Sequence, residues 1–412
     1  MLVNKKKDMT PFDMKKPPMK QKWYLMPLLW GGSWLMTRQF KLKIIKKNMT
    51  GVKPPFLVIS THQGFSDYYI TPLALFPYRT NYVSDMEGFA AFGEWLYRAI
   101  GCIGKRRYVS DSMVVKNIKQ AMGKGQTVVI YPESRHSNVG TTSYIPPNMG
   151  KLVKMMKVPL VILSAHGSYL ANPFWDEEHT RKVLMEATLE CVYTAKEVEK
   201  FSAQEIQKTI EEKLQYDEYK WQKDKNILIT EKKRAEGLHK ALYQCRKCNT
   251  EFHMKSENSG LYCEKCGGEW ELTPQGCLKN SLKEIHIPDW YEWQRENVIQ
   301  EIENEEYLAE FDVRVEALPN SKGFVPLGKG TLVHNKEGFY LKLQGEQLFF
   351  DHYSRESVQT EYDYRGKGMA IVLSTKDCCY YIYSEDENFN PTKIQFAGEY
   401  YHQKLMMKRK KV

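Results

Sequence analysis

The chain has 412 residues, of which 60 are Lys or Arg and 50 are Asp or Glu, so its formal net charge is +10. With 42% hydrophobic and 13% aromatic residues it can bury a core, which excludes wholesale disorder and a low-complexity polymer. The positive excess lies at the two ends: residues 1–50 hold eleven Lys and one Arg against two Asp, residues 404–411 add five cations, and residues 51–403 are net negative. This distribution favours two basic tethers to anionic lipids over nucleic acid as a partner of the whole chain.

The basic arm, residues 1–50, contains an uncharged aromatic segment. Trp23–Thr37 has 15 residues, fewer than the roughly 20 needed to cross a bilayer. Its three Trp and one Tyr lie between cations, which is typical of a segment in the membrane interface; a core helix with charged flanks is the alternative. No compact apolar run with a cleavage site follows the lysines at positions 5–7, so no secretory signal is expected. The sequence predicts a cytoplasmic protein attached peripherally to the inner face of a membrane.

Residues 51 to about 190 alternate short apolar runs with amphipathic stretches. Phe56–Ser60, Thr127–Tyr131 and Leu160–Ser164 are β-branched and are bounded by Gly, Pro or charge, as buried strands are. Ser112–Met122 places its apolar residues on one face of a helix. Strand, helix and strand at this spacing predict an α/β domain over residues 51–240, with a mostly parallel sheet flanked by helices.

The loop after the first strand carries a candidate base. His62 and Asp67 follow Phe56–Ser60 in a turn that contains Gly and Ser. Open α/β sheets present reactive side chains at the carboxyl ends of their strands. In such a turn Asp67 can fold back onto the imidazole and fix its tautomer, so that His62 acts as a general base.

Two further loops carry polar and cationic side chains. Pro132 ends the second strand and presents Glu133, Arg135 and His136 together. Three consecutive cations, Lys105–Arg107, follow two glycines, and this combination suits a phosphate group. A base at one strand end and cations at two other loops describe a site that activates a hydroxyl on an anionic substrate. Each loop taken alone is equally compatible with a solvated surface turn.

Two C-x2-C pairs, fourteen residues apart, come next: Cys245 with Cys248, and Cys263 with Cys266. Four thiolates at this spacing can close tetrahedrally around Zn²⁺, which predicts a zinc ribbon over residues 241–280. The metal is expected to be structural, because four cysteines leave no open coordination position. A redox dithiol pair and unmetallated cysteines are the alternatives. The chain has nine cysteines, and placing four of them in such pairs fits a reducing compartment.

The remaining chain is predicted as a helical connector, a small β domain and a basic tail. A chain of 412 residues is long enough for two or three domains. An aromatic and acidic patch, Trp290–Phe311, predicts a helical connector over residues 281–312. Short runs such as Phe339–Leu343 and Tyr380–Tyr383, separated by turn residues, predict a small all-β domain over residues 313–403. Residues 404–412 form the basic tail. A docking role is expected for the ribbon, and no role is assigned to the β domain.

Four blocks in fixed order resemble a known family. They are His62 with Asp67 five positions later, the Gly-rich loop ending in Arg107, the run Pro132–Ser137, and Val158–Pro159 before an apolar strand. This order resembles the glycerolipid acyltransferases, in particular the 1-acyl-sn-glycerol-3-phosphate (lysophosphatidate) acyltransferases, over roughly residues 20–230. The first block departs from the family at Thr61 and Gly64, where the family has Asn and Ser. The third block departs at Ser134, Arg135 and His136, where the family has Gly, Thr and Arg.

The resemblance implies acyl transfer from acyl-CoA or acyl-carrier protein to the free hydroxyl of lysophosphatidate, which makes phosphatidate in phospholipid biosynthesis. It implies His62 as the base and Asp67 as its orienting partner, with no covalent enzyme intermediate. An acyltransferase for another lysophospholipid and a non-catalytic lipid-binding or scaffold protein are the alternatives. The expected substrate-binding residues are Lys105, Arg106, Arg107, Glu133, Ser134, Arg135, His136 and Pro159.

Overall fold

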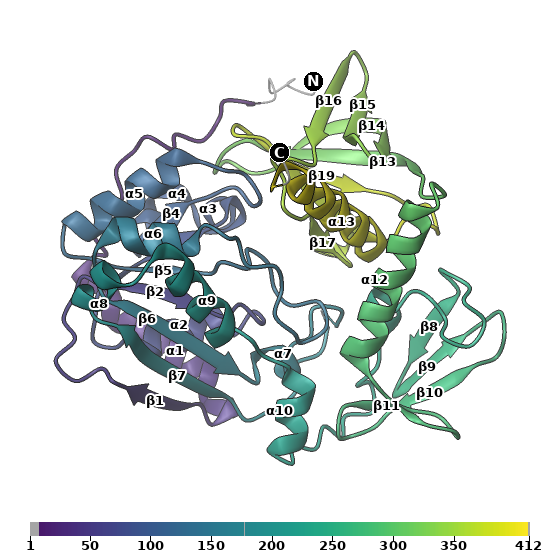
Figure 1. Cartoon of the computed structure of the whole chain (residues 1–412), viewed down its shortest axis with the longest axis horizontal. Coiled ribbons are helices and arrows are strands. Elements are labelled where there is room, and N and C mark those ends of the chain that lie inside the picture. Colours follow the sequence, from purple (N-terminus) through teal and green to yellow (C-terminus); the bar gives the residue numbers. More distant parts are fainter. Residues whose placement is uncertain (1–7, 177, 411–412) are drawn as a thin grey trace, which may run out of the picture. The chain divides into compact units, whose positions relative to one another are not determined.

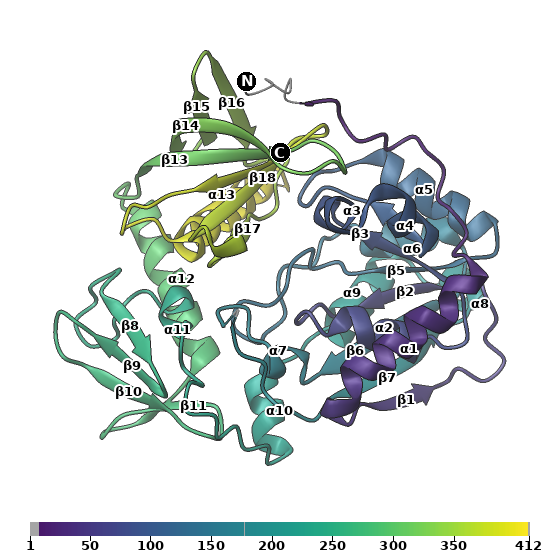
Figure 2. The same ribbon diagram turned by 180° about the vertical axis from the view of Figure 1, so that it is seen from behind.

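The computed structural model describes residues 8–176 and 178–410 (Figures 1 and 2). Lysines 5–7 of the predicted basic arm and residues 411–412 of the predicted tail lie outside the described residues. The chain divides into two compact units. Unit 1 comprises Met1–Pro17, Ser84–Asn117 and Asn297–Val412, and unit 2 comprises Pro18–Val83 and Ile118–Glu296. Residues 84–117 therefore group with the C-terminal region. The domain boundaries predicted from the sequence include these residues in the acyltransferase domain, and those boundaries stay a prediction.

A mostly parallel sheet organises unit 2 and runs in the order β1-β7-β6-β2-β5-β3. Its central strand β2 pairs in parallel with both β5 and β6, and only the β6–β7 pair is antiparallel. Every residue of β2 and β5 is buried, as expected for β-branched strands covered on both faces. The strands are β1 (Lys43–Lys47), β2 (Leu57–Ser60), β3 (Thr80–Ser84), β5 (Thr127–Ile130), β6 (Leu160–His166) and β7 (Glu186–Tyr193).

Helices cover both faces of this sheet, which confirms the predicted α/β class. Figure 1 shows α9 in front of the strands, and Figure 2, seen from behind, shows α1 in front of them. Helix α9 begins with a capping box formed by Ser202 and Glu205. Gly150 lets α6 approach α9 closely, because a Cβ there would lie 2.0 Å from the Ala203 carbonyl oxygen. The helices are α1 (Met26–Thr37), α2 (Asp67–Ala74), α6 (Met149–Met156), α7 (Ser168–Ala171), α8 (Ala195–Lys200), α9 (Ala203–Lys213), α10 (Glu218–Asp224) and α11 (Leu238–Ala241), with 3-10 turns at Trp23–Leu25 and Arg38–Phe40.

A small antiparallel sheet follows in unit 2, in the order β12-β11-β10-β9-β8. The fully buried Trp290, at the start of α12, packs against Trp270 with ring centroids 4.9 Å apart. Its indole N–H donates to the Gln244 carbonyl oxygen at 2.9 Å. This aromatic pair contributes to the core of a small sheet that is too short to bury many side chains. The elements are β8 (Met254–Glu257), β9 (Gly260–Cys263), β10 (Glu269–Leu272), β11 (Cys277–Lys279), β12 (Glu284–His286) and α12 (Ile287–Glu303).

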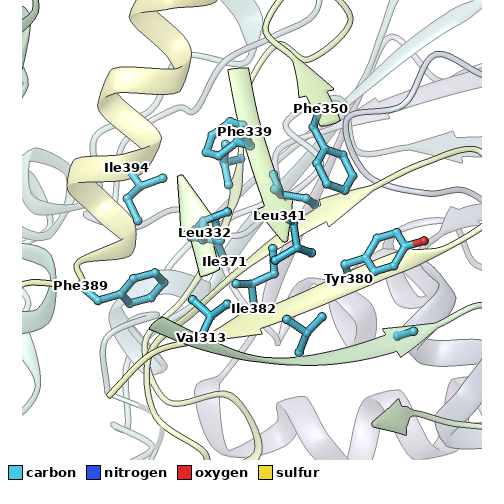
Figure 3. Packing of buried hydrophobic residues seen from close by; sticks show 14 of the residues in the cluster. Val313, Leu332, Phe339, Leu341, Phe350, Ile371, Tyr380, Ile382, Phe389 and Ile394 are labelled. Carbon is cyan, nitrogen blue, oxygen red and sulfur yellow. The ribbon is translucent and has the colours of Figure 1, made fainter. Parts of the chain in front are cut away.

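Unit 1 contains an antiparallel sheet in the order β16-β15-β14-β13-β19-β18-β17, which confirms the predicted C-terminal β region. Its core joins strand residues such as Phe339 and Ile382 to Phe389 and Ile394 (Figure 3). The sequence analysis did not predict the helix that packs here, α13. The strands are β13 (Ala309–Leu318), β14 (Val325–His334), β15 (Gly338–Leu343), β16 (Glu346–Asp351), β17 (Gln359–Glu361), β18 (Ala370–Ser374) and β19 (Cys379–Tyr383); α13 is Pro391–Lys410, and a 3-10 turn lies at Tyr364–Gly366.

The predicted helical patch Trp290–Phe311 was too long at its C-terminal end. Helix α12 ends at Glu303, Glu305 has a left-handed φ of 61°, and β13 begins at Ala309. The left-handed residue Glu305 ends the helical segment, and the chain continues into β13, in which buried and exposed residues largely alternate. The middle segment of unit 1, Ser84–Asn117, contains α3 (Met86–Phe92), α4 (Glu94–Ala99), β4 (Cys102–Gly104) and the start of α5 (Ser112–Gly123).

Over residues 8–176 and 178–410, none of the helices is both long enough and apolar enough to span a bilayer. Helix α1 instead exposes its apolar side chains. Trp34 is 60% exposed and Leu28 is 72% exposed, as is Trp23 in the preceding turn, and only Met26, Ser33 and Thr37 of α1 are buried. This helix is therefore not a core helix in the described structure.

Candidate active site

His62 and Asp67 meet in the loop that joins β2 to α2. Asp67 is the first residue of α2, where the backbone N–H groups at a helix start favour a negative charge. Its Oδ2 accepts hydrogen bonds from the backbone N–H of Gln63 at 2.6 Å and of Gly64 at 3.1 Å, and lies 3.3 Å from His62 Nδ1. The carboxylate therefore favours a proton on Nδ1 and leaves Nε2 as the basic nitrogen of the buried imidazole.

The loop is held in place by residues at which the sequence departs from the family pattern. Thr61 Oγ1 accepts a hydrogen bond from the Ala165 N–H at 3.1 Å, which ties the loop to β6. A Cβ at Gly64 would lie 3.1 Å from the Ser168 carbonyl oxygen, closer than most real Cβ contacts. The close approach of the backbone to Ser168 gives a physical reason for Gly at this position.

Glu133 connects the loop after β5 to the His62 loop. Its Oε1 accepts a hydrogen bond from the His62 backbone N–H at 2.8 Å. Its Oε2 accepts from the Ser143 N–H at 2.7 Å and from the Tyr216 hydroxyl at 3.0 Å. Burial raises the pKa of Glu133 to about 7, although these donors favour the charged form. Both carboxylate oxygens thus accept hydrogen bonds from the protein, and Glu133 holds the backbone of His62, the predicted base.

The residues after Glu133 bring a second imidazole to the first. The ring of His136 lies edge-to-face with the ring of His62, at 4.4 Å between centroids, and the ring of Tyr131 lies at the same distance. Arg135 is buried, and its Nε lies 3.4 Å from Ser143 Oγ. Ser134 has a left-handed φ of 59°, which Gly adopts more readily and which matches the family preference for Gly.

Pro159 lies at the other end of the strands from His62. Its carbonyl oxygen accepts a hydrogen bond from the N–H of Leu57, the first residue of β2, at 2.9 Å. Because β2 and β6 are parallel, Pro159 precedes β6 at their amino ends, whereas His62 follows the carboxyl end of β2. The structure does not bring these two predicted site residues together.

The three predicted phosphate-binding cations belong to unit 1, so the structure does not place them relative to His62. Arg107 forms an ion pair with Asp85, and its guanidinium lies 3.8 Å from Glu361 and 3.9 Å from Glu87. Arg106 is 3% exposed. Its guanidinium donates to the carbonyl oxygens of Pro319, Lys376 and Asp377.

Burial lowers the pKa of Lys105 and is opposed by the nearby Glu356. All three cations therefore have acceptors or opposite charges inside unit 1.

Sequence reasoning missed several residues of the site. Ser143 and Tyr216 hold Glu133. The buried Gln63 and Glu218 and the partly exposed His166 form a further group beside the loop. His166 had a usable signal, because it follows the predicted strand Leu160–Ser164 by two residues, as His62 follows Phe56–Ser60. Tyr216 and Glu218 had none, since their roles arise from where α10 packs.

The four cysteines of the two C-x2-C pairs lie together. Their sulfur atoms are all within 4.8 Å of one another. Cys245 Sγ lies 3.7 Å from Cys266 Sγ, and Cys248 Sγ lies 3.8 Å from Cys263 Sγ. Tetrahedral coordination with Zn–S bonds of about 2.3 Å separates the sulfurs by about 3.8 Å. The cluster therefore has the ligand type and the spacing that could hold a zinc ion.

Comparison with known proteins finds one family model and a similar solved structure. A family model described as Acyltransferase matches residues 41–165, the segment that contains His62, Asp67 and Glu133. No curated protein matches the chain. Among solved structures, the crystal structure of the 1-acyl-sn-glycerophosphate (LPA) acyltransferase PlsC from Thermotoga maritima is similar, with 14% sequence identity, coverage of 46% of this chain and 76% of that chain, and a TM-score of 0.36. Residues 41–165 therefore match the acyltransferase family.

Proposed function

We propose that the protein transfers a fatty acyl group from a thioester, acyl-CoA or acyl-carrier protein, to the free hydroxyl of lysophosphatidate. The observation that carries the proposal is the buried pair of His62 and Asp67 at the carboxyl end of β2, inside the segment that matches the acyltransferase family. The family supports acyl transfer. The identity of donor and acceptor rests on the four sequence blocks.

The proposed reaction uses His62 Nε2 as a general base. It removes the proton from the acceptor hydroxyl, and the resulting oxygen attacks the thioester carbonyl. The C–S bond breaks, the ester forms, and the imidazolium returns its proton to the departing thiolate. Asp67 stabilises the imidazolium through Nδ1. A positioned base of this kind contributes about 10² to 10⁴ in rate.

The acceptor phosphate needs a cation near the base. In unit 2, the loop after β5 carries the Arg135 guanidinium and His136, whose ring centroid is 4.4 Å from that of His62. Lys105–Arg107 remain a prediction from the sequence blocks, and their partners inside unit 1 compete with a phosphate. The acceptor headgroup is therefore the part of the proposal that most needs measurement.

The membrane attachment proposed for the N-terminal arm is supported by α1. Trp23 is 72% exposed and Trp34 is 60% exposed, and the nearby Lys20 and Arg38 are exposed as well. Aromatic rings beside cations suit the interface of an anionic bilayer, where a lysophospholipid acceptor resides. We place the protein at the inner face of the membrane, held there peripherally.

The zinc ion proposed for the four cysteines is structural. It would join the two C-x2-C turns of the ribbon and leave no position for substrate. Metal analysis of the purified protein should give about one zinc per chain, and the Cys245→Ser, Cys263→Ser double variant should give none. Clearly less than one ion per wild-type chain would contradict this part of the proposal.

Purified protein supplied with labelled acyl-CoA and lysophosphatidate in vesicles tests the reaction. We expect phosphatidate and one free thiol for each ester formed. Lysophosphatidylcholine, lysophosphatidylethanolamine and glycerol 3-phosphate in place of lysophosphatidate identify the headgroup. Repeating the assay with acyl-carrier protein identifies the donor. No ester with any acceptor would instead support a non-catalytic lipid-binding protein.

A further inference from the structure

Glu218, the first residue of α10, is a fully buried carboxylate next to the His62 loop. Its Oε1 accepts a hydrogen bond from Gln63 Nε2 at 2.9 Å and lies 2.8 Å from His166 Nδ1. Its Oε2 accepts from the Gly167 N–H at 2.6 Å. One carboxylate therefore binds the loop after β2 and the end of β6.

The backbone of the same residue holds a third loop. The Glu218 N–H donates to the Gly140 carbonyl oxygen at 2.8 Å, in the segment that follows Glu133. The first residue of helix α10 thus contacts the segments that follow β2, β5 and β6, which carry the polar residues of the site. Such a carboxylate is costly to bury unless its acceptors are filled, and here both oxygens have partners.

Gln63 is the link between Glu218 and the proposed base. It follows His62 directly, and its backbone N–H donates to Asp67 Oδ2 at 2.6 Å. Its side-chain amide donates to Glu218 Oε1 and, at 2.6 Å, to the Ala165 carbonyl oxygen. Both amide hydrogens are used, and Gln63 is fully buried. The side chain cannot turn without breaking a bond that holds the segment between His62 and Asp67.

His166 completes the network on the side away from Gln63. Its ring stacks on Trp221, one turn along α10, with centroids 5.1 Å apart and an interplanar angle of 10°. Burial raises the pKa of Glu218, and the hydrogen bond and charge of His166 oppose that rise. His166 therefore helps to keep Glu218 an acceptor toward Gln63.

We infer that Glu218 is a positioning residue for the proposed acyl transfer: by holding the Gln63 side chain, it fixes the distance and angle between His62 and Asp67. The inference rests on the proposed function and adds to it a residue outside the four sequence blocks. Glu218 acts through Gln63 and not on the reacting atoms. A shift of about 1 Å in a catalytic group can cost about 10²-fold in rate, so a loosened loop has a measurable effect.

The test compares Glu218→Gln with Gln222→Leu in the acyl-transfer assay. Gln222 is also fully buried on α10, but its amide bonds only the carbonyl oxygens of Ile227 and Pro274. We expect Glu218→Gln to lower kcat about tenfold, with KM for the acyl donor changed less than about twofold. Gln222→Leu should lower the melting temperature and leave kcat within about twofold.

A double-mutant cycle separates positioning from general destabilisation. Gln63→Ala and Glu218→Ala each remove the hydrogen bond from Gln63 Nε2 to Glu218 Oε1, so the double variant should lose no more kcat than the more damaged single variant. Independent, multiplying losses would overturn the inference. Equal losses of kcat in Glu218→Gln and Gln222→Leu would also overturn it.

His62→Ala in the same assay keeps the two proposals apart. If His62→Ala retains wild-type activity, the proposed function fails and the role of Glu218 fails with it. If His62→Ala is inactive while Glu218→Gln keeps wild-type kcat, only the inference on Glu218 fails.

Discussion

The polar groups around His62 in unit 2 and those around Arg107 in unit 1 are both enclosed by protein, but their charges are balanced in different ways. At His62, the carboxylates of Asp67 and Glu133 accept hydrogen bonds from backbone N–H groups, and the neighbours of the imidazole are aromatic rings. At Arg107, the guanidinium faces the carboxylates of Asp85 and Glu361.

The difference is the one expected between the proposed reactive arrangement at His62 and a stabilising one at Arg107. Neutral N–H donors hold a carboxylate without neutralising it, so the charge of Asp67 remains available to an imidazolium. A cation surrounded by carboxylates is already neutralised, and releasing it to bind a substrate would take the balancing positive charge from those partly buried carboxylates. Residues singled out by the same family pattern can therefore have different physical roles.

The largest effect is expected for Asp67→Asn. The amide cannot hold the Nδ1 proton as the carboxylate does, so the wrong tautomer of His62 becomes favoured. We expect kcat to fall about 10³-fold, measured as ester formation. Asp111→Asn is the matched control, because Asp111 only accepts a hydrogen bond from the Met113 N–H at the start of α5. A loss of less than about tenfold would remove Asp67 from the proposed mechanism.

Arg106→Met tests the stabilising cluster. The change removes the hydrogen bonds to the carbonyl oxygens of Lys376, Asp377 and Pro319, although the Pro319 oxygen keeps the Phe12 N–H. We expect the free energy of unfolding in urea to fall by about 3 kcal/mol. Lys322→Met removes a cation that is 74% exposed and paired with Asp8, so it should have almost no effect. Lost acyl transfer with unchanged stability would show that Arg106 binds substrate, which contradicts the structural role.

The pH dependence of stability in Glu133→Gln tests the buried carboxylate next to His62. The folded pKa is about 7 against an ordinary value of 4.5, so the folded protein keeps a proton that the unfolded chain releases between these values. This stability is fully present below pH 4.5 and is lost as the pH rises through 7.

Glutamine cannot titrate, so the stability of Glu133→Gln relative to wild type should rise by roughly 2 to 3 kcal/mol between pH 5 and pH 8. Urea unfolding at the two pH values measures the change. A difference that does not depend on pH would mean that Glu133 keeps an ordinary pKa.

The smallest effect is expected for Ser134→Gly. Glycine adopts the left-handed φ of 59° without the penalty of a Cβ, so we expect stability to rise by less than about 1 kcal/mol with activity retained. Ser137→Gly, three residues on, removes a hydroxyl that donates to the Thr141 carbonyl oxygen at 2.7 Å and should destabilise. A lower melting temperature for Ser134→Gly would show that the Ser134 side chain matters more than its backbone.

Much of unit 2 could be predicted from local pattern. The β-branched runs became β2, β5 and β6, and the pairing of His62 with Asp67 followed from five residues of spacing after a strand. Helix α13 was missed because polar residues interrupt its apolar stripe. Gln395 and Glu399 are buried there and bond to each other at 2.9 Å. A sequence pattern predicts that such polar residues are exposed, because the hydrogen bonds that allow their burial are not encoded locally.

The site could be predicted only where its residues lie close in sequence. Gln63 contacts Glu218 across 155 positions, and Arg106 contacts carbonyl groups more than 200 positions away. No local pattern encodes such contacts, because they depend on how helices and loops pack after the sheets form. The grouping of residues 84–117 with the C-terminal sheet has the same cause.

The rate of ester formation from acyl-CoA and lysophosphatidate, measured for wild type and His62→Ala under identical conditions, tests the central claim most directly. With both proteins folded by circular dichroism, we predict that wild type releases one thiol per phosphatidate and that His62→Ala is slower by about 10² to 10⁴. Equal rates for the two proteins, or no ester from either, would contradict the assignment of His62 as the base of an acyltransferase.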